Sequence, residues 1–115
     1  MTVAQTRTVD WMGIEKGTGH VSLTVLDDLD WSDEQEHLLL LQEKLNAYLA
    51  FIESEEVFER LVKVIGRRVA ASTPVNVTII AKFELTPRAH EFLDYATVSF
   101  RNAGFSLVHR VAKVP

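Results

Sequence analysis

Hydrophobic and polar residues alternate most clearly in two stretches of the chain. In residues 75–84, apolar side chains occupy every second position and mostly polar ones lie between them, and residues 20–27 alternate in the same way. Successive side chains of a strand point to opposite faces, so both stretches are predicted to be strands with one buried face. Residues 8–15 and 105–111 are predicted to form two further strands.

A tight turn is predicted between the first two strands. Residues 16–19 (KGTG) contain two glycines, which supply the backbone freedom that a hairpin connection needs. Gly13 lies inside the first strand, where an isolated glycine predicts a β-bulge.

Apolar residues at helical spacing predict three helices. These span residues 32–53, 55–66 and 86–103. Ser32 and Gln35 match the capping-box pattern at the start of the first helix. Thr86 followed by Pro87 is a favourable start for the third helix. Gly66 ends the second helix and Gly104 follows the third, as is typical of helix C-termini.

The predicted elements follow the order β-β-α-α-β-α-β. The helix at 86–103 is long enough to cross between parallel strands. We therefore expect an α+β fold of two layers, in which a four-stranded mixed sheet carries two to three helices on one face. The chain has 115 residues and is 47% hydrophobic and 24% charged. These values favour one globular domain, residues 1–115.

The first helix carries more apolar surface than one core requires. One stripe, suited to face the sheet, comprises Leu38, Leu41, Leu45, Tyr48, Leu49 and Ile52. A second stripe lies about 120° away, contains Leu40, Ala47 and Phe51, and is flanked by Lys44 and His37. Either residues 55–66 fold over this stripe or another subunit covers it. The second alternative predicts an interface at Leu40, Lys44, Ala47 and Phe51.

Charge is distributed unevenly along the acidic chain. The net charge is −4, with −9 in residues 1–56 and +5 in residues 57–115. This balance argues against nucleic acid as a partner, because such binding needs clustered basic side chains. The split predicts either attraction between the two halves of one chain or an antiparallel homodimer or charged protein partner.

Composition also excludes several classes of protein. The chain has no cysteine, which excludes disulfides, thiolate nucleophiles and zinc ribbons. It has no apolar run long enough for a secretory signal or a membrane span, so we expect a cytoplasmic protein without a membrane partner. The glycines at 13, 17 and 19 lack the lysine and helix start of a phosphate loop, and we expect no cofactor.

Few residues suggest chemistry. Asp33 and His37 are four residues apart on one helix face and are weak candidates for a metal site, although an acidic helix start is the commoner arrangement, and no metal is expected. Trp31, His37 and His109 are candidates to line a ligand-binding cleft between sheet and helices. No combination of nucleophile, base and orienting group is visible, which argues against an enzyme without excluding one.

Two segments resemble a known family. They are residues 28–31 (DLDW) and residues 36–54 (EHLLLLQEKLNAYLAFIES). They resemble a family of small bacterial proteins of unknown function, in which this helix follows a short hairpin. The similarity continues through the strand at 75–84 and the terminal helix, glycine and strand. The resemblance implies a shared fold and a bacterial origin, and it implies no activity.

The apolar excess and the charge split favour a non-catalytic module that binds a protein or forms homodimers. An acidic antagonist of a basic protein is one variant of this hypothesis. The alternative is a small-molecule-binding protein or enzyme with its cleft near Trp31, His37 and His109.

Overall fold

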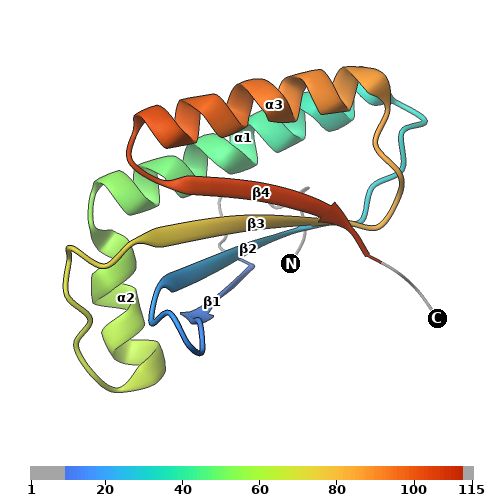
Figure 1. Cartoon of the computed structure of the whole chain (residues 1–115). Helices are drawn as coiled ribbons and strands as arrows, with labels where there is room; N and C mark the ends of the chain where they lie inside the picture. The colour runs from blue at the N-terminus through green and yellow to red at the C-terminus, as the bar shows by residue number, and fades with distance from the viewer. Residues whose placement is uncertain (1–9, 113–115) are drawn as a thin grey trace.

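The computed structural model describes residues 10–112 (Figure 1). Its elements are β1 (Trp11–Ile14), β2 (Val21–Asp27), α1 (Glu34–Glu53), α2 (Glu56–Ile65), β3 (Val75–Ala81), α3 (Pro87–Asn102) and β4 (Ser106–Val111). The predicted order and the α+β class are confirmed.

The four strands form one mixed sheet in the order β1-β2-β3-β4. The β1 and β2 strands are antiparallel, whereas β3 is parallel to both β2 and β4. Each parallel pair is joined through helices, because α1 and α2 connect β2 to β3 and α3 connects β3 to β4. Helices α1 and α3 run side by side along the sheet, and α2 lies at its β1 end (Figure 1).

Alternation in the strands places one face of the sheet in the core. The buried strand residues include Val21, Leu23 and Val25 of β2 and Val75, Val77 and Ile79 of β3. Val57 and Leu61 of α2 belong to the same hydrophobic cluster. The third strand ends at Ala81, three residues before its predicted end, where its partner β2 also ends.

The predicted turn is present, but the predicted bulge is wrong. Gly17 and Gly19 have φ values of 91° and 75°, which non-glycine residues rarely adopt. Gly13 pairs regularly with Ser22 and causes no bulge. A Cβ atom at Gly13 would lie 2.7 Å from Cη2 of Trp11, so the glycine leaves room for the indole on the sheet surface.

The N-cap of helix α1 lies one residue later than predicted. Asp33, and not Ser32, caps the helix, because Oδ1 of Asp33 accepts the N–H of Glu36 at 3.1 Å. The Ser32 hydroxyl instead donates to the carboxylate of Asp30 at 2.6 Å. The cap at Thr86 is confirmed, since its hydroxyl accepts the N–H of Ala89 at 3.1 Å.

Helix α2 ends as the sequence predicts. Gly66 follows it with a φ of 75°, and its N–H donates to the carbonyl of Val62 at 3.0 Å. Within residues 10–112, no helix combines the length and apolarity needed to cross a membrane.

The N-cap of α1 can be tested by substitution. Asp33→Ala should lower the free energy of unfolding by about 1 kcal/mol, because the N–H of Glu36 loses its partner. Ser32→Ala should lower it by less than about 0.5 kcal/mol, since the exposed hydroxyl caps no helix. Urea denaturation of both variants measures the difference, and a larger loss for Ser32→Ala would contradict the assignment.

Candidate functional site

Two buried acid–base pairs join α1 to the sheet. The first contains Asp27, the last residue of β2, and His37 at the end of the first turn of α1. Nε2 of His37 lies 2.7 Å and 2.8 Å from the two carboxylate oxygens of Asp27. The side chains are 2% and 1% exposed, so no substrate in solvent reaches the pair.

The hydrogen bonds of His37 determine how many protons the pair carries. Nδ1 lies 2.9 Å from the carbonyl oxygen of Asp30, and because a carbonyl only accepts, Nδ1 must be protonated. Nε2 faces a carboxylate, so a hydrogen bond there also requires a proton, on either the imidazole or Asp27. The pair therefore holds one shared proton and has no net charge in either form.

Burial raises the pKa of Asp27, and the hydrogen bond with His37 opposes this increase. The negative charge of Asp28 adds a smaller increase. Both increases favour retention of the shared proton, because the ionised form would place a carboxylate in a poorly solvated site.

Trp31 covers the imidazole of this pair. The two rings stack with centroids 3.6 Å apart and an interplanar angle of 20°. Trp31 is half-buried and belongs to the segment between β2 and α1. The predicted neighbours Trp31 and His37 thus lie together, in contact through their ring faces.

The weak metal candidates have other roles. Asp33 caps α1, and both ring nitrogens of His37 are occupied by Asp27 and Asp30. Among residues 10–112, no group of three or more histidine or acidic side chains is placed to hold a metal ion.

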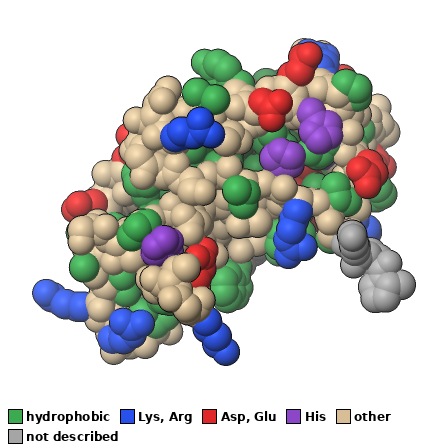
Figure 2. Space-filling model, viewed as in Figure 1, with side chains coloured by type: hydrophobic (Ala, Val, Ile, Leu, Met, Phe, Trp, Pro, Cys, Tyr) green, Lys and Arg blue, Asp and Glu red, His purple; other side chains and the backbone are tan. Residues whose placement is uncertain are grey.

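His109 lies apart from this pair. It belongs to β4, on the far side of β3 from β2, and its neighbour in the register is Ile79. Its ring makes an edge contact with His90 of α3, with centroids 5.9 Å apart. Figure 2 shows two histidine side chains together on the face formed by α3 and β4. The predicted set of Trp31, His37 and His109 is therefore only partly assembled.

The second buried pair joins Lys44 to Asp10. Nζ of Lys44 lies 2.7 Å from Oδ1 of Asp10, and both side chains are fully buried. The other carboxylate oxygen accepts the N–H of Leu26 at 2.8 Å. The hydrophobic pattern predicts Lys44 in an interface and does not reveal this pair, because the partner is 34 residues away and Asp10 carries no local signal.

Tyr48 extends the second pair toward β2. Its hydroxyl accepts the N–H of Asp10 at 2.7 Å and donates to the carbonyl of Thr24 at 2.6 Å. Burial raises the pKa of Tyr48 and the charge of Asp10 adds to the increase, so the phenol stays neutral and serves as a donor.

Helix α1 is rotated relative to the position that its hydrophobic pattern predicts. The residues it buries are His37, Leu41, Lys44, Leu45, Tyr48, Phe51 and Ile52. The centre of this arc lies about 50° from that of the predicted core stripe. Of the predicted interface, Lys44 and Phe51 are buried within the chain itself, with exposures of 0% and 7%, and only Leu40 and Ala47 are half-buried.

Phe51 packs where α1 meets α2. It shares the core cluster with Val57 and Leu61 of α2, and the guanidinium of Arg60 lies 5.4 Å from its ring centroid. The following helix thus covers this end of the second stripe, as one of the two alternatives predicted.

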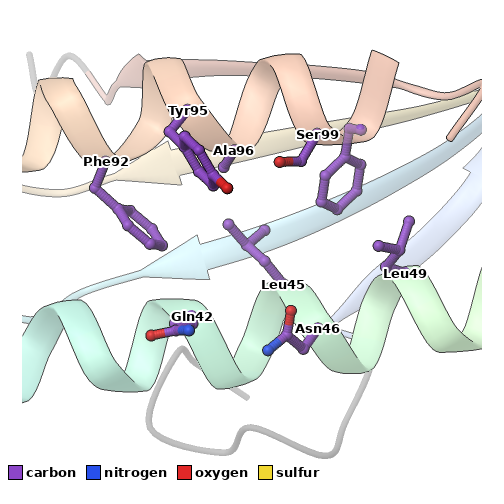
Figure 3. A pocket seen from close by; sticks show the side chains of 9 residues that line it. Gln42, Leu45, Asn46, Leu49, Phe92, Tyr95, Ala96 and Ser99 are labelled. Atoms are coloured by element: carbon purple, nitrogen blue, oxygen red, sulfur yellow. The ribbon is translucent and has the colours of Figure 1, made fainter. Parts of the chain in front are cut away.

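The rotation leaves an apolar groove on the outer surface, between α1 and α3. Gln42, Leu45, Asn46 and Leu49 of α1 face Phe92, Tyr95, Ala96 and Ser99 of α3 across it (Figure 3). One hollow in this groove has a volume of about 120 Å³, and a second of about 220 Å³ adjoins it at Gln42 and Phe92. We refer to the surface formed by Leu38, Leu39, Leu49, Phe92 and Tyr95 as the α1/α3 face.

The α1/α3 face exposes large apolar side chains. Tyr95 is 75% exposed and Leu39 is 50% exposed, while Leu38, Leu49 and Phe92 are half-buried. The polar side chains along the groove are mostly amides, and Arg88 is its one charged lining residue within the described chain.

Sequence comparison identifies the family. The model of the Family of unknown function (DUF6572) matches residues 1–113, and the chain therefore belongs to this family. No curated protein and no solved structure matches it. The expected membership in an uncharacterised family is confirmed, whereas the bacterial origin stays a prediction.

The energetic coupling of the second pair is measurable. Lys44→Met should lower the free energy of unfolding by about 3–5 kcal/mol, because it leaves the carboxylate of Asp10 buried without its cation. Adding Asp10→Asn should recover part of this loss, since no ionised group then remains at the site. Urea denaturation of the two single variants and the double variant gives the coupling energy. Additive losses would show that the two side chains do not interact.

Proposed function

We propose that this member of the DUF6572 family is a non-catalytic module that self-associates, with the α1/α3 face of one copy packed against that of a second copy. The observation that carries the proposal is the groove between α1 and α3, with Tyr95 strongly exposed at its edge.

The composition of the α1/α3 face supports a protein partner. Large apolar side chains that lie together on a surface usually mark an interface, and tyrosine is enriched among residues that dominate binding energy. In the monomer, the exposed parts of Tyr95 and Leu39 add little hydrophobic stabilisation. Burial of each in an interface would contribute about 1.5–3 kcal/mol to the free energy of association.

A second copy is the partner that this shape favours. In a twofold dimer the same patch must fit itself, so it has to present both a protrusion and a hollow. Here Tyr95 supplies the protrusion, and the hollow beside it is lined by Gln42 and Leu49. Apart from Arg88, the described groove is lined by uncharged side chains, so two identical faces can approach with little like-charge repulsion.

The distribution of ion pairs supports the binding of a partner. Within residues 10–112 one ion pair, Arg88–Glu34 at 3.5 Å, joins the acidic and basic halves of the chain. Attraction within one chain therefore leaves most of the charged side chains available at the surface.

Two observations favour binding over catalysis. The Asp27–His37 pair is buried under Trp31, and every nitrogen of its imidazole already has a partner. His109 lies on another strand, against His90. The cleft expected near Trp31, His37 and His109 therefore lacks the convergence of accessible groups that a reaction would need.

Sedimentation velocity over a range of concentrations tests the proposal. The unsubstituted chain should form dimers, and Tyr95→Glu and Leu39→Glu should each raise the dissociation constant at least about tenfold, because each buries a charge in an apolar interface. Val108→Glu is the matched control, since Val108 is 52% exposed on β4 and lies outside the α1/α3 face.

Two results would contradict self-association through this face. One is a chain that stays monomeric at high concentration. The other is a dimer that Val108→Glu weakens as much as Leu39→Glu. Circular dichroism spectra of all three variants confirm that the substitutions at these exposed positions leave the fold intact.

A further inference from the structure

We propose that Asp27, His37 and Trp31 form a proton-dependent latch. While the Asp27–His37 pair keeps its shared proton, the latch holds residues 28–33 against α1, and loss of that proton as the pH rises releases this segment. The latch is separate from the α1/α3 face and does not depend on the proposed self-association.

Three contacts with the Asp27–His37 pair hold the segment between β2 and α1 in place. Oδ1 of Asp27 accepts the N–H of Leu29 at 3.3 Å. The carbonyl of Asp30 accepts from Nδ1 of His37 at 2.9 Å. The indole of Trp31 stacks on the imidazole at 3.6 Å. Displacement of either member of the pair therefore loosens the whole segment.

Loss of the shared proton makes the closed arrangement unfavourable. Without it, the neutral imidazole has one N–H for two acceptors, so either Nε2 faces the ionised carboxylate of Asp27 or Nδ1 faces the carbonyl of Asp30 through a lone pair. Neither group is exposed enough for water to replace the lost hydrogen bond. The pair also changes from neutral to a net charge of −1 in a buried site. Separation of the two side chains relieves both penalties, and it breaks the contacts of Asp30 and Trp31 with the imidazole.

Neighbouring charges act on the pair from several elements. Asp28 and Asp30 contribute negative charge from the segment itself. Lys82, which follows β3, lies with Asp27 and Asp28 around a hollow of about 260 Å³ and contributes positive charge.

At the start of α1, Glu34 is paired with Arg88 of α3 at 3.5 Å, and Asp33 caps the helix. The acidic groups favour retention of the shared proton, and Lys82 disfavours it.

The direction of the pH dependence follows from Asp27. Its pKa is raised in the folded chain, chiefly by burial. A group of this kind contributes stability that is complete below the ordinary carboxyl value near 3.8 and is lost as the pH rises through the raised value. The latch is therefore closed on the acidic side of its transition and open on the alkaline side.

The test follows Trp31 in a chain with no other tryptophan. Trp11→Phe leaves Trp31 as the single tryptophan, because the sequence has two. Between about pH 5 and pH 10, its emission should change in one transition, as the indole separates from the imidazole. Amide exchange in residues 28–33, corrected for intrinsic rates, should rise about tenfold per pH unit below the midpoint, as release of one proton requires, and should level off above it.

Asp27→Asn in the Trp11→Phe background should remove the transition. The asparagine amide donates to Nε2 without a titrating proton, so the segment stays closed. Asp28→Asn is the matched control, because it removes a carboxylate one residue away and should retain the transition. His37→Gln provides a second variant, which keeps a donor toward Asp27 without an imidazole and should also lose the transition.

The latch is refuted if Asp27→Asn and His37→Gln titrate like the parent, or if the folded parent shows no change in Trp31 emission across this range. Loss of the transition in Asp28→Asn but not in Asp27→Asn would likewise overturn it. Far-UV circular dichroism at each pH separates release of the segment from global unfolding.

Discussion

Helix α1 has to bury two polar side chains, and this requirement determines how the helix sits on the sheet. His37 and Lys44 are seven residues apart, so they lie two turns from each other on the same side of the helix. A buried cation or imidazolium without a partner costs several kcal/mol, and each of these side chains meets a carboxylate from the sheet layer. Asp27 at the end of β2 serves His37, and Asp10 just before β1 serves Lys44.

These pairs set the rotation of α1 about its own axis, and the outer surface follows from that rotation. With His37 and Lys44 facing inward, Leu38 and Leu49 turn away from the sheet toward α3. They become part of the α1/α3 face, which an arrangement based on hydrophobicity alone would have buried. The buried Asp27–His37 pair and the exposed α1/α3 face are thus two consequences of one constraint.

Local patterns predicted most of the fold because their causes lie within a few residues of each other. The alternation in β2 and β3, the glycine turn between β1 and β2, and the cap at Thr86 all act over short distances. The two wrong predictions, the cap of α1 and the bulge in β1, also concern residues close to one another in the sequence. Ser32 and Asp33 are both good capping residues and differ by one position, and Gly13 accommodates the ring of Trp11 where the pattern predicted a bulge.

The site could be predicted only in part, because its determinants connect distant segments. A hydrophobic pattern counts lysine and histidine as polar and assigns them to the surface, so it placed Lys44 beside an exposed stripe. Its partner Asp10 precedes β1, and nothing in the sequence indicates that this carboxylate lies under α1. Trp31 and His37 were predicted as neighbours and are in contact, but Asp27, which completes the pair, was not singled out.

The rotation of α1 is tested most directly by nuclear magnetic resonance of its two polar side chains. Slowly exchanging protons should be visible on the Lys44 ammonium and on both ring nitrogens of His37, with cross-relaxation to Asp10 and to the end of β2. Ammonium and ring protons that exchange as fast as those of exposed lysine and histidine, without contacts to the sheet, would contradict the account.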